Sequence, residues 1–331
     1  MPVFIAAPYQ DILGLITQIS VLLFTARIFG EIFQRFGQPS VIGEILAGVF
    51  WGPSFLGRIF PQLIGFALPA TKIQGHLLEV VGLFGAMFLL LITGLETDLP
   101  LIKRLARFTL GTALGGILLP FVSGFILGQY FIPDYLLADP NRRLVFTLFL
   151  ATAMSISAIP VISRVLIDMK LMRRDLGQSI IAAGMIDDTV GWILLSLVTG
   201  MASGQKLGLM SIVTPLVVIA GFIIFSFTIG KWCIGVVFNF VQDEVKSQDK
   251  FLTLIVGLAF LWGSLSKSLS FEPLLGVFIV GIIIGEIPRF HYEVKAKLES
   301  IAMAIFSPVF FAIAGLKVNV YNLLTLDYLL I

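Results

Sequence analysis

Long apolar stretches separated by short polar connections repeat along the whole chain. A helix needs about 17–25 apolar residues to cross the hydrocarbon core of a bilayer. Glycine and proline interrupt several of these stretches, as membrane helices tolerate better than soluble ones. The pattern therefore predicts an all-α polytopic membrane protein with about ten spans. The expected spans are Ile12–Phe33, Val41–Phe60, Leu77–Leu99, Thr109–Tyr130, Leu144–Ile167, Gly177–Thr199, Leu209–Phe238, Phe251–Ser266, Pro273–Ile287 and Ile301–Leu316.

The composition excludes a soluble protein. Of the 331 residues, 58% are hydrophobic and only 13% are charged, whereas a soluble domain is about 25% charged. The net charge of +2 is too small to indicate a nucleic-acid partner. No low-complexity tract or long polar linker divides the chain. Residues 1–331 are therefore expected to form one transmembrane domain, and the expected partner is the lipid bilayer.

Basic residues in the connections predict how the chain is oriented. Of the 22 lysines and arginines, twelve follow odd-numbered spans and seven follow even-numbered spans. Because basic loops stay on the cytoplasmic side, the N-terminus is expected outside. The first residues lack the basic segment of a signal peptide, so the first span is expected to insert without cleavage. The single Cys233 excludes a disulfide within the chain.

Two adjacent carboxylates, Asp187 and Asp188, stand in the middle of the apolar stretch Gly177–Thr199. A charged carboxylate at membrane depth costs several kcal/mol, and such residues usually mark an ion or proton pathway. Neighbours on a helix point about 100° apart, so the two side chains are expected to have different roles. Gly184 and Gly191 are placed to let another backbone approach them. The structural alternative is that a buried lysine or arginine neutralises each aspartate.

The preceding span carries a proline and several hydroxyl groups. Pro160 cannot donate a hydrogen bond to the carbonyl of Ile156, so the helix is expected to kink or open there. Thr152, Ser155 and Ser157 would supply oxygen ligands at such a break, which is the usual scaffold of a transporter ion site. The alternative is an ordinary proline kink in which the hydroxyl groups bond to their own helix.

Glu44 is a third carboxylate within an expected span. Because it lies near the start of that span, its side chain could simply reach interfacial water. A secondary role in ion binding is the other interpretation, and the sequence does not decide between them.

Four motifs, in order along the chain, resemble the monovalent cation:proton antiporters, most closely the branch of Kef-type proteins and cation/H⁺ exchangers. They are Gln38–Ser54, Leu89–Leu99, Ser155–Arg164 and Gly184–Trp192. The resemblance implies the inverted-repeat fold of the sodium/hydrogen exchangers, with broken helices that cross near the carboxylates. It also implies a homodimer in a membrane, here expected to be the bacterial cytoplasmic membrane. Residues 12–99 would be dimer or panel helices, 109–199 the first core bundle, and 209–316 a linker helix and second panel helices.

The same resemblance suggests roles for single residues. Asp188 looks like the carboxylate that binds a monovalent cation and a proton in alternation, and Asp187 looks like its partner. Thr152–Ser157 resembles the first crossing break. Many Kef-like members have glutamine at the position of Asp187, so this chain is similar to the electrogenic type. The family has thirteen spans, and its partner lysine and second break would follow Ile331. The protein is thus expected either to continue beyond that residue or to be an inactive fragment.

These observations predict a secondary active antiporter that exchanges Na⁺ or K⁺ for protons by alternating access, with both ions competing at Asp188. No cofactor is expected beyond the transported ions. A cation channel or efflux protein and a sodium-coupled solute symporter of similar fold are the alternatives. An intramembrane aspartyl protease, and with it an enzyme, is disfavoured because its two carboxyl groups must lie about 3 Å apart, which neighbours on one helix cannot achieve.

Overall fold

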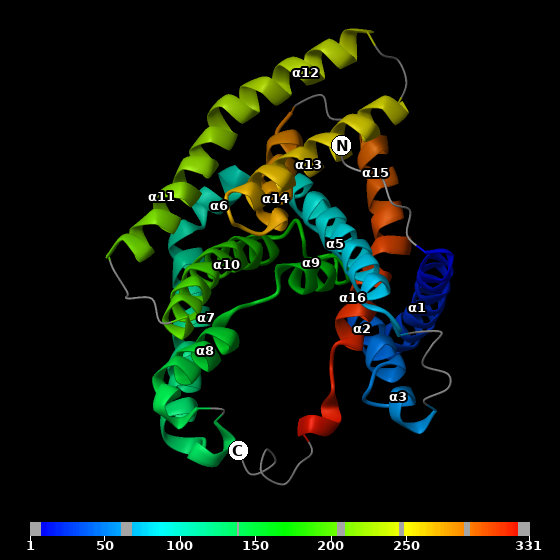
Figure 1. The fold of residues 1–331 in the computed structure, drawn as a ribbon. Coiled ribbons are helices and arrows are strands. Elements are labelled where there is room, and N and C mark those ends of the chain that lie inside the picture. Colours follow the sequence, from blue (N-terminus) through cyan, green and yellow to red (C-terminus); the bar gives the residue numbers. More distant parts are fainter. Residues whose placement is uncertain are drawn as a thin grey trace, which may run out of the picture. The chain divides into compact units, whose positions relative to one another are not determined.

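The computed structural model of the protein describes residues 8–60, 68–137, 139–203, 209–244, 248–287 and 292–323. All secondary structure in these ranges is helical (Figure 1). The helices are α1 (Tyr9–Arg35), α2 (Ser40–Trp51), α3 (Leu56–Ile59), α5 (Lys72–Leu95), α6 (Leu99–Arg104), α7 (Ala106–Ile126), α8 (Arg143–Ser155), α9 (Ile159–Asp168), α10 (Asp175–Ala202), α11 (Leu209–Phe225), α12 (Lys231–Glu244), α13 (Gln248–Ser268), α14 (Pro273–Gly285), α15 (Tyr292–Ile301) and α16 (Ser307–Leu316). Short π- or 3₁₀-helical turns are η1 (Leu127–Phe131), η2 (Asp134–Leu136), η3 (Pro140–Arg142), η4 (Ser226–Gly230), η5 (Ala302–Phe306) and η6 (Val320–Leu323).

Nine of the ten predicted spans are confirmed, and the tenth, Pro273–Ile287, corresponds to a helix shorter than a full span. Within the described ranges, nine helical segments are long and apolar enough to cross a membrane, and α14 is a tenth, shorter apolar helix. Several spans combine two helices, such as Pro140–Asp168, which contains α8 and α9. The last span begins at Glu293, earlier than the predicted Ile301, because the charged residues of α15 mask its helical continuity in the sequence. Most of the final apolar run, residues 324–331, lies outside the described residues.

The chain divides into two compact units. Unit 1 contains residues 1–92, 167–169 and 291–330. In it, α1, α2 and α16 pack against one another. Leu22, Ala47 and Ala312 are among the fully buried side chains of its core. Gly48 faces the backbone of Ala312 so closely that a Cβ atom would overlap it. Glycine therefore permits the close helix contact on which this unit depends.

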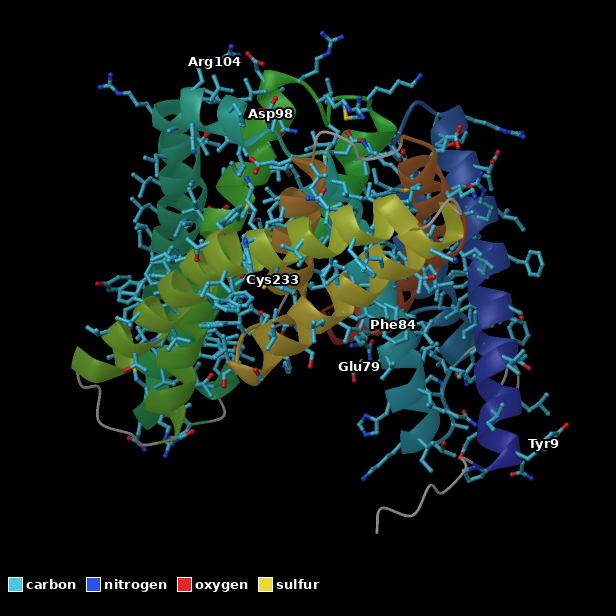
Figure 2. The ribbon with its side chains drawn as sticks, turned by 90° about the horizontal axis from the view of Figure 1, so that it is seen from above. Tyr9, Glu79, Phe84, Asp98, Arg104 and Cys233 are labelled. Atoms are coloured by element: carbon cyan, nitrogen blue, oxygen red, sulfur yellow. The ribbon has the colours of Figure 1, made fainter. Side chains whose placement is uncertain are left out.

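Unit 2 contains residues 93–166 and 170–290. Its helices α7, α8 and α10 pack together, and α13 packs along α14. At one end of this unit, Asp98 caps α6 by accepting a hydrogen bond from the N–H of Leu101, at 2.9 Å. Arg104 lies near the same end (Figure 2) and forms an exposed 3.5 Å ion pair with Asp175. Charged connections of this kind are expected where helices leave the apolar phase.

Contact between α13 and α14 leaves no room for a side chain at Gly276, because its Cβ atom would overlap the carbonyl oxygen of Trp262. Backbone cannot rotate away as a side chain can. Gly276→Ala is therefore expected to lower the stability of the protein by about 1–3 kcal/mol, as overpacking does elsewhere. Gly257→Ala is the matched control, since nothing lies within 4 Å of its Cβ position. Thermal unfolding of the two variants in detergent checks this, and equal midpoints would contradict it.

Candidate functional site

Asp187 and Asp188 lie halfway along the 28 residues of α10. With a rise of about 1.5 Å per residue, each carboxylate is roughly 20 Å from either end of the helix. Asp187 is only 8% exposed, and Asp188 is half-buried. Both acids thus lie near the middle of a helix long enough to cross a membrane, where a charge would be most costly to hold.

The helix break predicted in the preceding span is present. Helix α8 ends at Ser155 and α9 begins at Ile159, and the three residues between them are not helical. The last hydrogen bond of α8 joins the N–H of Ile156 to the carbonyl oxygen of Thr152, at 3.2 Å. Pro160 follows in the first turn of α9, where its missing N–H leaves no helical bond unmade. The partially negative C-terminal end of α8 and the partially positive N-terminal end of α9 therefore meet at the break.

The structure brings one of the three predicted hydroxyl groups to the aspartate pair. The Ser157 hydroxyl donates a hydrogen bond to Oδ2 of Asp187, at 3.2 Å. In contrast, the Thr152 hydroxyl donates to the carbonyl of Leu148 at 2.7 Å, and the Ser155 hydroxyl donates to the carbonyl of Thr152 at 2.9 Å. Their hydrogens thus bond to their own helix. Ion binding by these oxygens stays a prediction.

The two aspartates have different neighbours, as their directions on the helix require. Oδ2 of Asp187 would lie 3.5 Å from a Cβ atom at Gly116 of α7. Its other oxygen, Oδ1, is buried and has no hydrogen-bond partner among the described residues. Asp188 is acted on by the negative charge of Asp187 and, more weakly, by that of Glu272 at the start of α14. In the described part of the chain, no lysine or arginine forms an ion pair with either aspartate.

The two glycines of α10 let the broken span approach the carboxylates. A Cβ atom at Gly191 would lie 2.5 Å from Cγ1 of Ile156, within the break. One at Gly184 would lie 3.3 Å from Cγ1 of Ile159, at the start of α9. The broken span thus approaches α10 at both glycines, but through isoleucine side chains and not through the backbone that was predicted.

Two other carboxylates, Glu44 and Glu272, lie outside the Asp187–Asp188 pair. Glu44 lies in unit 1 and is only 1% exposed, so it does not reach the membrane interface as one interpretation required. A role for it in ion binding stays a prediction. Glu272 was not predicted, because it stands next to Pro273 in what the sequence presents as a connection. The available signal was a carboxylate directly before an apolar run too short to cross the bilayer.

An all-helical membrane fold with a carboxylate pair beside a broken span defines a class of ion-coupled transporters. The family profile described as "Sodium/hydrogen exchanger, transmembrane" matches residues 20–331. The chain belongs to this family, which consists of transporters. It is 32% identical over 324 residues to the "Na(+)/H(+) antiporter NhaS4" of Synechocystis, covering 97% of this chain and 77% of that protein.

More distant relatives agree with this assignment. The "Cation/H(+) antiporter 17" of Arabidopsis thaliana is 29% identical over 92% of this chain, although the chain spans only 37% of that protein's length. The solved structure of the sodium proton antiporter MjNhaP1 from Methanocaldococcus jannaschii superimposes with a TM-score of 0.62. That match covers 95% of this chain and 72% of that chain, at 18% identity. The likeness shows that the chain has the sodium/proton antiporter fold.

Proposed function

We propose that this protein exchanges a monovalent cation, Na⁺ or K⁺, for protons across a membrane by alternating access. The observation that carries the proposal is the pair Asp187–Asp188 at the middle of α10, beside a helix break whose Ser157 bonds to one of them. Membership of the sodium/hydrogen exchanger family supports the reaction type. Two relatives are named as cation/proton antiporters, and we infer the same type of exchange for this protein from its similarity to them.

Competition for one carboxylate would couple the two ions. An ionised Asp188 attracts a cation, while a protonated Asp188 is neutral and does not attract one. The empty, ionised carboxylate is the costly state at membrane depth. The site therefore changes access readily only with a cation or a proton bound, and each ion is carried in a different half of the cycle.

The break would complete the cation's surroundings. Carbonyl groups at the C-terminal end of α8 carry partial negative charge, which favours a cation. The N-terminal end of α9 carries partial positive charge, which favours an ionised Asp187. Thr152, Ser155 and Ser157 add hydroxyl oxygens within the same few residues. Carboxylate, carbonyl and hydroxyl oxygens suit Na⁺, K⁺ and Li⁺ alike, so the site chemistry defines the class of cation only.

Pro160→Ala tests the break itself. Alanine restores an N–H that can bond to the carbonyl of Ile156, so the helix is free to close through residues 156–158. The variant is expected to be at least as stable as the wild type and to bind the cation about tenfold more weakly. Its KM for the cation, measured beside its unfolding temperature, checks this. An unchanged KM would contradict a role for the break in binding.

The activity is tested with proteoliposomes that contain the full transporter. An imposed pH gradient is followed with a trapped dye while Na⁺, K⁺, Li⁺ or choline is added. An antiporter dissipates the gradient with one or more alkali cations and not with choline, and an imposed cation gradient drives protons uphill with the membrane voltage held at zero. Cation flux without proton movement would instead indicate a channel, and cation-dependent uptake of an organic solute would indicate a symporter.

The assembly and placement of the protein are part of the same proposal. We expect a homodimer in a bacterial cytoplasmic membrane, with the N-terminus outside and the more basic connections in the cytoplasm. Accessibility of single cysteines to a membrane-impermeant reagent, introduced in the connections of a Cys233→Ser background, measures the orientation directly.

A further inference from the structure

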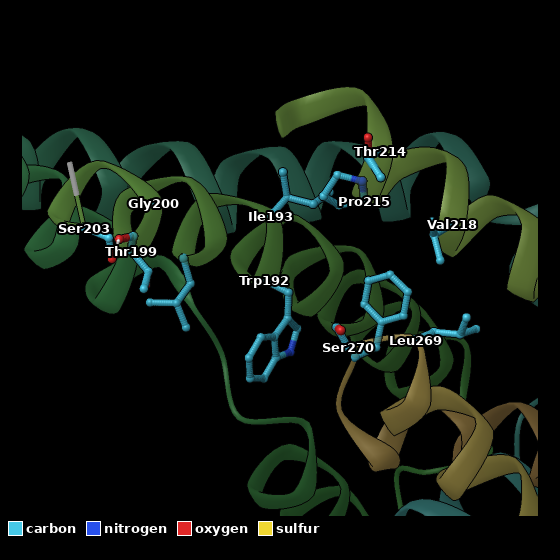
Figure 3. A pocket seen from close by; sticks show the side chains of 12 residues that line it. Trp192, Ile193, Thr199, Gly200, Ser203, Thr214, Pro215, Val218, Leu269 and Ser270 are labelled. Atoms are coloured by element: carbon cyan, nitrogen blue, oxygen red, sulfur yellow. Dashed lines mark hydrogen bonds between the residues drawn. The ribbon is translucent and has the colours of Figure 1, made fainter. Parts of the chain in front are cut away.

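A cavity of about 570 Å³ lies beside the second half of α10, within unit 2 (Figure 3). One wall is α10, a second is the first half of α11, and a third is the turn between α13 and α14. Hydroxyl groups of four side chains alternate with apolar ones along these walls. The lining residues are Trp192, Ile193, Leu195, Thr199, Gly200, Ser203, Thr214, Pro215, Val218, Leu269, Ser270 and Phe271.

The α10 wall of this cavity continues the face of the helix that carries Asp188. Trp192, Leu195 and Thr199 follow Asp188 by four, seven and eleven residues. In an α-helix, that spacing places all four residues on one face. Asp187 is turned away from the same face by about 100°. The cavity therefore lies along the second half of α10, on the side of the helix that carries Asp188 rather than Asp187.

The turn opposite α10 is held in a defined shape. Ser270 adopts a left-handed conformation, with φ 69°. The N–H of Phe271 donates to the carbonyl of Ser266 at 3.1 Å, and the hydroxyl of the fully buried Ser266 donates to the carbonyl of Glu272 at 2.7 Å. These bonds hold the turn in which Glu272 directly follows Phe271, a residue of the cavity lining.

Glu272 stands at the start of a helix that is shorter than a full span. Helix α14 has 13 residues, so at about 20 Å it is too short for the hydrocarbon core of about 30 Å. A glutamate stands at each end of it. Glu286 forms an ion pair with Lys231 at 2.6 Å. Glu272 forms no ion pair with any residue that the structure describes, and its side chain does not cap its own helix. Its negative charge acts on Asp188, less strongly than the charge of Asp187 does.

We propose that this cavity is the route by which the hydrated cation reaches Asp188 from the side of the membrane on which α10 ends, and that Glu272 attracts the cation on that route. A carboxylate in a narrow passage with apolar walls focuses its field there and raises the local concentration of cations. The hydroxyl groups of Thr199, Thr214 and Ser270 replace part of the water that the ion leaves behind. The inference rests on the proposed cation:proton exchange and names a further residue for it.

Glu272→Gln tests the proposal in proteoliposomes with uniformly oriented protein. The variant is expected to raise the KM for the cation about threefold to tenfold on the side where α10 ends, with kcat within about twofold of the wild type. The KM on the opposite side is expected to stay unchanged, and the effect is expected to shrink at high ionic strength because salt screens the charge. Glu272→Asp keeps the charge and is expected to restore the wild-type KM.

Glu79→Gln is the matched control, since Glu79 (Figure 2) is an exposed glutamate of unit 1. It is expected to leave the KM unchanged on both sides. A Glu272→Gln variant whose KM rises equally on both sides would indicate a structural role and would overturn the proposal. An unchanged KM on both sides would overturn it as well. If the wild type itself exchanges no alkali cation for protons, the proposed function fails; the inference alone fails when the wild type is active and Glu272→Gln behaves like Glu79→Gln.

Chemical modification tests the route without removing a charge. Thr199→Cys, in a Cys233→Ser background, places a thiol in the cavity wall. A positively charged thiol reagent added on the α10-end side is expected to inhibit exchange by at least about tenfold, because the attached group blocks the passage and repels the cation. Val217→Cys is the control, as Val217 is 62% exposed and lies outside the lining. Complete labelling at position 199 with normal exchange would overturn the proposal.

Discussion

Replacing Asp188 by asparagine is expected to reduce cation-dependent proton flux to the level of empty liposomes. Asparagine has nearly the same shape, so the packing of α10 is preserved. It neither carries a negative charge for the cation nor takes up a proton, and both halves of the exchange lose their carrier. Because the neutral side chain is also cheaper to hold at membrane depth, the variant is expected to insert and fold at least as well as the wild type.

Flux through Asp188→Asn is measured with a trapped pH dye at saturating cation, alongside the amount of folded protein in the same vesicles. Asp175→Asn is the matched control, because Asp175 lies in the first turn of the same helix with its side chain 66% exposed. That variant is expected to exchange at the wild-type rate. Wild-type exchange by Asp188→Asn would mean that the carrier is elsewhere, and the proposed function would have to be abandoned.

The sequence predicted the membrane spans best, because the bilayer restricts the structures that can cross it. Every backbone polar group at membrane depth must be satisfied internally, so spans are helices of a set length and their apolar runs are easily recognised. The break near Pro160 was predictable for a related reason, since the missing N–H is a covalent property of proline. The start of the last span was misplaced because the charged α15 continues as a helix into the apolar residues that follow it.

Side-chain partners were less predictable. Thr152, Ser155 and Ser157 are equivalent in the sequence as hydroxyl groups near a break, yet only Ser157 is non-helical and able to turn toward Asp187. A hydroxyl within a helix bonds most easily to the carbonyl one turn before it, as that of Thr152 does. The sequence could not decide which residue would leave the helix, because tertiary contacts such as that of Ile156 with Gly191 are not visible in it.

Glu272 was missed for a different reason. Carboxylates in connections are normally solvated, and only the shortness of α14 sets this one apart. Its electrostatic influence on Asp188 depends on how segments far apart in the sequence are folded, which no local pattern reports. The division into two units was not predictable from local patterns either. Helix α14, for example, belongs to unit 2 and packs there through contacts such as that of Gly276 with Trp262.

Asp187→Asn is expected to leave exchange measurable but to remove most of the net charge carried in each cycle. Asp187 is buried against Gly116 and accepts a hydrogen bond from Ser157, away from the face of α10 that leads to the cavity. We therefore expect it to act as a second charge beside the proposed exchange site. With both carboxylates present, a cycle can exchange more protons than cations and carry current. With Asp188 alone, one cation replaces one proton and the exchange is electroneutral.

The ratio of current to flux measures this directly. Transient currents on a solid-supported membrane give the charge moved, and the dye assay gives the protons exchanged by the same preparation. Ser157→Ala is the matched control, because it removes the hydrogen bond to Asp187 and keeps the charge; its ratio is expected to equal that of the wild type. For Asp187→Asn the ratio is expected to fall by at least about fivefold, since the second carboxylate that lets protons and cations differ in number is gone. A wild-type ratio in that variant would show that the two aspartates do not divide their roles in this way.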